Sequence, residues 1–181
     1  MTLLDSATLV ISGGNYFTHA TLGTAAPEDL TSIPVGWANL GHTDLEDVIA
    51  FASEGGEATT LGTLQKRTLR TTYSNRIDTF TFNLQQFDEA SLKLYYGSNM
   101  GELVADSIWR TVPDNPAITV VAFLAVFTDG VKKFGIYAPA AEIYRADDAE
   151  FASDELAGLP IQIKPLNHST NTWKVALTPL A

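Results

Sequence analysis

The chain of 181 residues contains no cysteine. This absence excludes disulfide bonds, thiolate catalysis and cysteine-ligated zinc or iron–sulfur sites. Long apolar runs are also missing: the longest, Ala117 to Phe127, has eleven residues with one threonine and is too short to span a bilayer as a helix. No basic stretch precedes the first apolar residues, so we expect no signal peptide. The composition predicts a soluble chain without membrane insertion.

Positive charge is absent from residues 1–65. The first basic residue is Lys66, and Arg67, Arg70 and Arg76 follow within ten positions. The net charge of −10 argues against a protein that gains affinity from phosphate contacts, although it allows one that nucleic acid passes without binding. An acidic N-terminal third followed by a basic cluster indicates that the acidic part of the surface contacts the basic part of another surface. The acids of that third are Asp5, Glu28, Asp29, Asp44, Glu46, Asp47, Glu54 and Glu57.

Alternation of apolar and polar residues predicts a mainly β fold. It is clearest over 77–85, where Phe80, Phe82 and Leu84 point to one face and threonine, asparagine and glutamine to the other. Turn residues between apolar runs predict two hairpins and further short strands. These are strands 7–12 and 15–23 around a Gly-Gly pair, a strand over 35–41, a hairpin over 117–139 turning at Asp129–Gly130, and two strands near the C-terminal end.

One helix is predicted over 87–97. Asp88 suits the N-cap and Gly97 the position after the last turn, and an apolar stripe is formed by Phe87, Ala90, Leu94 and Tyr95. The strand over 118–127 is apolar on both faces, so each face needs a cover. Three arrangements would provide such cover. The helix packs on the strand, a neighbouring subunit packs on it, or the strand is central, between the core and the helix.

Eight to ten short strands and one helix add up to a single domain over 1–181. The fold class is mainly β (α+β), as a β-sandwich or a barrel-like fold.

Motifs for catalysis or metal binding are not found. The chain has three histidines, and His42 beside Asp44 is the best acid–base or metal candidate, but either role needs further partners at workable spacing. The acidic clusters Asp44–Asp47 and Asp147–Glu150 do not match calcium-loop spacing. We expect no enzyme, no metal and no cofactor. A carbohydrate-binding module is the alternative, with stacking candidates Trp37, Trp109 and Trp173.

The segment Gly41–Lys66 is predicted to be a long acidic loop with apolar spots. Exposed apolar side chains there would promote aggregation unless the loop docks on another copy of the chain. Acids on one part and bases on another describe a head-to-tail contact, which closes into rings or continues as a filament. The expected contact residues are Asp44, Glu46, Asp47, Val48, Ile49, Phe51, Glu54 and Glu57 in the loop, received by Lys66, Arg67, Arg70 and Arg76.

Four stretches carry a resemblance to a known family. They are "VGWANLGHTDLEDVIAF", "GGEATTLGTLQKRTLRTT", "FTFNLQQFDEASLKLYYG" and "EFASDELAGLPIQIKPL". In this order they resemble the major tail (tail tube) proteins of long-tailed bacteriophages, particularly those of actinobacterial hosts. The similarity runs from about residue 35 to 165.

The resemblance implies a structural virion protein that assembles into stacked hexameric rings. The sheets of the subunits would join around a channel for genome ejection, and Gly41–Lys66 would match the loop that reaches the adjacent ring. It implies a tape-measure protein in the lumen, tail terminator and tail-tip proteins as partners, DNA in transit, and assembly in the host cytoplasm. A C-terminal immunoglobulin-like domain is not expected. The inner tube of a contractile injection machine is a related alternative.

Overall fold

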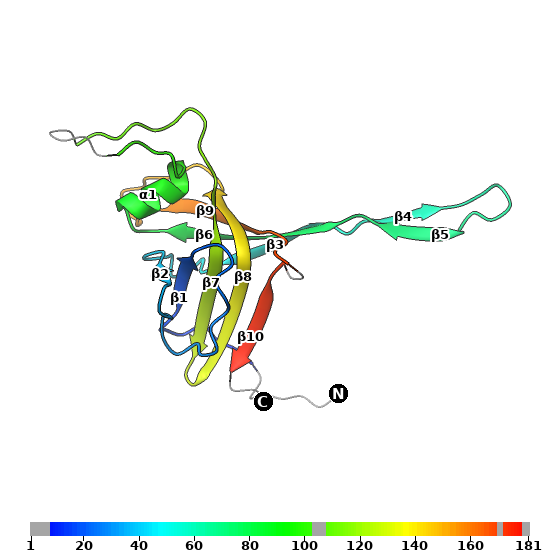
Figure 1. Cartoon of the computed structure of the whole chain (residues 1–181), viewed down its shortest axis with the longest axis horizontal. Coiled ribbons are helices and arrows are strands. Elements are labelled where there is room, and N and C mark those ends of the chain that lie inside the picture. Colours follow the sequence, from blue (N-terminus) through cyan, green and yellow to red (C-terminus); the bar gives the residue numbers. More distant parts are fainter. Residues whose placement is uncertain (1–7, 103–107, 170–171, 179–181) are drawn as a thin grey trace.

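The computed structural model (Figure 1) describes residues 8–102, 108–169 and 172–178. They form ten strands and one helix, which confirms the mainly β prediction. The elements are β1 Tyr16–Ala20, β2 Ala38–Asn39, β3 Ala50–Gly55, β4 Ala58–Leu61, β5 Arg70–Tyr73, β6 Arg76–Leu84, α1 Glu89–Tyr96, β7 Thr119–Asp129, β8 Lys132–Arg145, β9 Leu159–Pro165 and β10 Lys174–Thr178.

Eight strands form one antiparallel sheet in the order β2-β1-β7-β8-β9-β6-β3, with β10 also on β8. The 14-residue strand β8 shares one edge between two partners, because its first half pairs with β10 and its second half with β9. The sheet rolls up so that Phe17 of β1 stacks on Phe82 of β6 at 4.8 Å between ring centroids. The predicted barrel-like character is therefore present.

The segment after β2 closes the rolled sheet. The Leu40 amide donates to the Phe17 carbonyl at 2.8 Å on the β1 side. On the β6 side, Thr43 forms an isolated bridge with Leu84, and the Gln85 amide donates to the His42 carbonyl at 2.8 Å. At these positions on β1 and at the end of β6, backbone groups that a sheet edge would leave unpaired are thus paired within the chain.

Strand β7 is buried on both faces from Ala122 to Thr128, which confirms a central position. Phe123, Ala125 and Phe127 enter the main core, and the alternate residues enter a second cluster with Leu30 and Trp37. The cover of the second face is thus the segment before β2, and not the helix or a neighbour that the sequence suggested. The hydroxyl of Tyr137 donates to the Thr24 carbonyl at 2.6 Å and holds this segment down.

The helix α1 is two residues shorter at its start and one at its end than the predicted 87–97, but both predicted caps are correct. The Asp88 carboxylate accepts from the Ser91 amide at 2.8 Å as an N-cap, and Gly97 follows the last turn. The predicted stripe is partly wrong, because Phe87 lies before the cap and is exposed, as is Ala90. The buried face is instead Ser91, Leu94 and Tyr95, packed toward β8 and β9.

Three predicted strand boundaries are corrected. Residues 8–12 form no strand, because β1 has both edges occupied by β7 and β2; the segment bonds to the end of β7, with the Ser12 amide 3.0 Å from the Thr128 carbonyl. Residue 7 lies outside the described residues. The strand expected over 35–41 shortens to β2, and the β7–β8 turn falls at 130–131, one residue later than predicted.

Replacing Phe82 by alanine tests the closure of the rolled sheet. Phe82 is 3% exposed and contacts both Phe17 and Phe123, so Phe82→Ala should lower the free energy of unfolding by about 3–5 kcal/mol. The matched control is Phe87→Ala, at a ring that is 46% exposed, with an expected loss within about 1 kcal/mol. Urea unfolding measures both values, and equal losses would contradict the assignment of the core.

Candidate functional site

The predicted loop Gly41–Lys66 is in large part a two-stranded arm, which corrects the prediction. β3 pairs with β6 in the main sheet, and β4 pairs with β5 beyond it. Figure 1 shows the arm projecting from the body on the side opposite α1. Residues 50–77 are all exposed. The strands form because short Thr-rich stretches face each other, with Thr59 opposite Thr72 and Thr60 opposite Thr71.

Both strands of the arm are interrupted at the same level, at residues 56–57 and 74–75. Gly55 and Gly56 have φ of 83° and 72°, and Ser74 and Asn75 lie opposite. A Cβ at Gly55 would lie 2.1 Å from the Asn75 carbonyl oxygen, so only glycine fits. Pairing resumes beyond this interruption, where the Ser74 amide donates to the Glu57 carbonyl at 3.0 Å.

The root of the arm is held by Asp78. Its carboxylate accepts from the Ser53 hydroxyl at 2.8 Å and the Trp173 indole N–H at 3.0 Å, and it pairs with Arg76 Nε at 3.0 Å. Burial raises the pKa of this carboxyl, but the hydrogen bonds and the guanidinium outweigh burial and hold the pKa below its ordinary value of 3.8. β3, β6 and the segment before β10 are thereby joined at one point.

The acidic and apolar residues predicted for the loop lie in different places. Asp44 accepts from the Glu46 amide at 2.9 Å and from the Gln85 side chain at 3.3 Å, at the base of the body. Val48 and Ile49, expected to be exposed, pack against the main core. Phe51 is 52% exposed, with its ring on Phe80 and Trp173. Asp47 is exposed near Asp44, and Glu54 and Glu57 lie on the arm.

Three of the four predicted basic residues occupy the far part of the arm. Lys66 and Arg67 lie in the turn that joins β4 to β5, and Arg70 begins β5. Arg76 is at the root, paired with Asp78. Within one chain the structure does not bring the basic turn together with the acids of residues 44–47.

An acidic groove at the other end of β6 was not predicted as a site. Its volume is about 530 Å³, and its floor includes Thr81 and Asn83 of β6 and Gln162 of β9. The segment between β8 and β9 forms its wall, where the Tyr95 hydroxyl donates to the Asp147 carbonyl at 2.9 Å. Only the run of acids at 147–155 signalled it in the sequence. The acidic lining residues are Asp44, Asp147, Asp148, Glu150 and Glu155.

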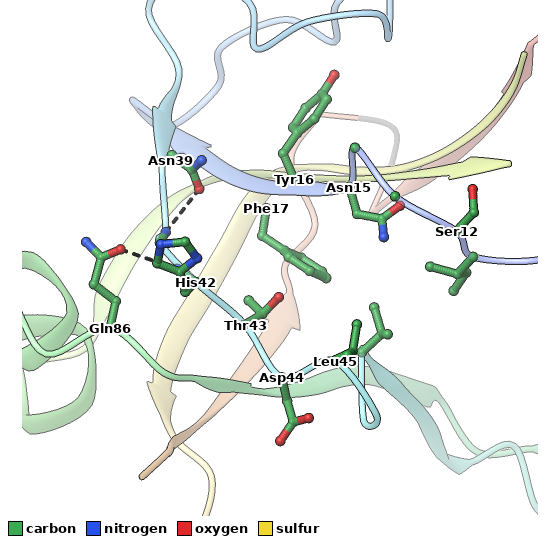
Figure 2. A pocket seen from close by; sticks show the side chains of 15 residues that line it. Ser12, Asn15, Tyr16, Phe17, Asn39, His42, Thr43, Asp44, Leu45 and Gln86 are labelled. Atoms are coloured by element: carbon green, nitrogen blue, oxygen red, sulfur yellow. Dashed lines mark hydrogen bonds between the residues drawn. The ribbon is translucent and has the colours of Figure 1, made fainter. Parts of the chain in front are cut away.

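A second cavity of about 530 Å³ contains the histidine that the sequence singled out. Figure 2 shows that His42 and Asp44 point in different directions, so they form no acid–base pair. The amides of Gly41 and His42 donate to the side-chain oxygens of Asn39 and Gln86, at 3.0 and 3.3 Å. These contacts support the closing segment of the sheet. Among the described residues no group of three His, Asp or Glu side chains is placed to hold a metal ion.

The three tryptophans lie in separate environments. Trp37 is buried against Tyr137 in the second cluster, and Trp173 lies at the arm root. Trp109, between α1 and β7 in the sequence, is 79% exposed. No shared stacking surface supports the carbohydrate-binding alternative. In the described part of the chain, no helix has the length and apolar character to cross a membrane.

Replacing Asp78 by asparagine tests the arm root. At neutral pH, Asp78→Asn should lower the free energy of unfolding by roughly 1.5–3 kcal/mol, because a charged acceptor is lost. A depressed pKa means that this stabilisation is present above the unfolded pKa and is lost as the pH falls through the folded pKa. The difference from wild type should therefore shrink below about pH 4.

The control for Asp78→Asn is Asp114→Asn, at an exposed carboxylate, with an expected change within about 0.5 kcal/mol. Denaturant titrations followed by tryptophan fluorescence between pH 7 and 3 measure both. A difference for Asp78→Asn that stays constant over this range would show that its charge does not act as described.

The comparisons with known proteins cover both the part of the chain that forms the arm and the part that forms the rolled sheet. Residues 1–176 match the family model described as "Phage tail tube protein". The chain is 38% identical over 177 residues to the major tail protein Gp23 of Mycobacterium phage L5, and 35% identical to that of Mycobacterium phage D29. Each alignment covers 91% of this chain and 87% of the relative. The resemblance drawn from the sequence is confirmed: the chain belongs to the phage tail tube protein family and is a structural subunit of the virion tail.

Proposed function

We propose that copies of this chain assemble into hexameric rings that stack into a tube, with the arm making the contact between rings. The observation that carries this proposal is that every residue from 50 to 77 is exposed. Apolar side chains on the outer arm, left exposed by the described residues, favour association. Leu61, Leu64 and Leu69 are 52%, 93% and 56% exposed.

Open sheet edges support joining of subunits within a ring. In the described part of the chain, β3 pairs only with β6 and β10 only with β8, so each keeps an edge that pairs with no strand. Such edges accept strands from another copy and are a liability in a protein that stays monomeric. Joined edges would make a continuous sheet around a channel.

The channel is proposed to hold a tape-measure protein during assembly and to pass DNA at ejection. The net charge of −10 suits this role, since an acidic surface repels phosphate and gains nothing from counterion release. Tail terminator and tail-tip proteins would cap the two ends, and assembly would take place in the host cytoplasm. In this role the subunit has no catalytic step, metal or cofactor.

Shortening the arm tests the role of the arm. Replacing residues 58–73 by an Asn-Gly turn keeps β3 paired with β6 and removes only the outer hairpin. The shortened protein should fold and stay unassembled, while the full chain forms tubes in negative-stain micrographs. Unchanged near-ultraviolet circular dichroism would show that the body is intact. Tubes of normal length from the shortened protein would overturn the proposal.

Salt should weaken assembly if basic residues of the arm face acids of another subunit. Exposed ion pairs contribute about 0.2–1 kcal/mol each, and at physiological ionic strength they are screened beyond about 8–10 Å. Six equivalent pairs of ~0.5 kcal/mol would add ~3 kcal/mol per ring junction. Sedimentation in increasing sodium chloride should show less tube. Apolar contacts alone would not weaken with salt, so unchanged or increased sedimentation would contradict a role for charge.

A further inference from the structure

The arm tip, defined as residues 61–70, presents apolar and basic side chains together. Besides its three exposed leucines it carries Lys66, Arg67 and Arg70, none of which pairs with a carboxylate of the described residues. Thr63 and Lys66 exchange backbone hydrogen bonds at 2.8 and 3.2 Å, so a hydrogen-bonded turn presents these side chains on one short segment.

The acidic groove has the opposite chemistry. Five carboxylates line it. Among the residues that the structure describes, no lysine or arginine lines it, and none of the five pairs with a cation. It also has an apolar part, with Leu156 76% exposed beside Ala152. The outward face of β6 and β9 that forms its floor carries Thr81, Asn83 and Gln162. The groove therefore complements the tip in both charge and apolar character.

The tip and the groove lie at opposite ends of the molecule. The arm leaves β6 at Arg76, and the groove lies over Thr81 and Asn83 near the other end of the same strand. In Figure 1 the arm points away from α1, whose Tyr95 contacts the groove wall. From Gly55 to Leu61 the arm extends about 20 Å away from the body at ~3.3 Å per residue, so a tip does not turn back into its own groove. It can reach that of another copy.

We propose that the arm tip of one subunit docks in the acidic groove of a second copy, with Leu64 against Leu156 and the three basic residues facing the groove carboxylates. The contact joins different surfaces of two copies and therefore continues from copy to copy. Charge also determines which surfaces of the two copies pair, because the carboxylates of the groove repel the other acidic surfaces of the subunit. This inference rests on the proposed tube and names the acceptor of its arm contact.

Cross-linking tests the contact directly, since the chain has no cysteine of its own. Leu64→Cys and Leu156→Cys proteins are mixed under assembly conditions and treated with a short bis-maleimide. The mixture should give a cross-linked dimer, while each protein alone gives at most a trace. The matched control replaces Leu156→Cys by Val35→Cys, at a fully exposed residue outside the groove, and should give no dimer. Equal dimer from the control mixture would overturn the inference.

Charge reversal tests the pairing of charges. Arg67→Glu with Arg70→Glu, and separately Asp148→Lys with Glu150→Lys, should each reduce sedimented tube about tenfold at low salt. Combining all four should restore most of it and returns the net charge to −10. Glu28→Lys with Asp114→Lys makes the same charge change at exposed acids outside the groove, and should not rescue the tip variant. Melting temperatures verify that each variant is folded.

The outcomes separate this inference from the proposed tube. If tip reversal stops assembly but groove reversal does not, or if the folded four-fold variant stays unassembled, the groove is not the acceptor, although the arm still carries assembly. Rescue by Glu28→Lys with Asp114→Lys would show that the tip responds only to overall charge, and that too overturns the inference. If the wild-type chain forms no tubes, or if the shortened arm still forms them, the proposed function itself fails.

Discussion

The structure depends on one strand, β6, which lies partly in the main core and partly in the exposed arm. Over its last five residues β6 buries Phe80, Phe82 and Leu84 in the main core, while its first residues, Arg76 and Ile77, are exposed and belong to the arm. The core contacts therefore determine where the arm starts and in which direction it leaves the body. Loss of the Phe17–Phe82 contact would affect the fold and the position of the arm together.

The arm combines a root held by hydrogen bonds with one interruption of its strands. Asp78 joins Ser53, Arg76 and Trp173, and Phe51 packs over the same region, so the inner half is part of the body. Beyond Gly55, within the part of the chain that the structure describes, β4 and β5 pair only with each other. A two-stranded ribbon with little buried apolar area has low local stability, which suits a segment that gains its remaining contacts on assembly.

Charge is distributed along the long axis of the subunit. Three cations occupy the outer end of the arm, and five carboxylates line the groove at the opposite end of the body. A symmetric dimer would use the same patch on both copies, whereas this arrangement favours contacts between unlike ends. The polarity is consistent with a tail tube subunit that associates with other copies of itself.

Local patterns in the sequence determined the mainly β class, the β6 alternation, the caps of α1 and the β7–β8 hairpin, because neighbouring residues specify each of them. The order of four stretches also identified the family. Tertiary structure decided the rest. The arm needs pairing between residues 50–61 and 70–81, the second face of β7 is covered by a segment about 90 residues earlier in the chain, and the groove combines Asp44 with residues 81–83 and 146–162. Contacts between residues so far apart depend on how the whole sheet rolls up, and no local pattern records that.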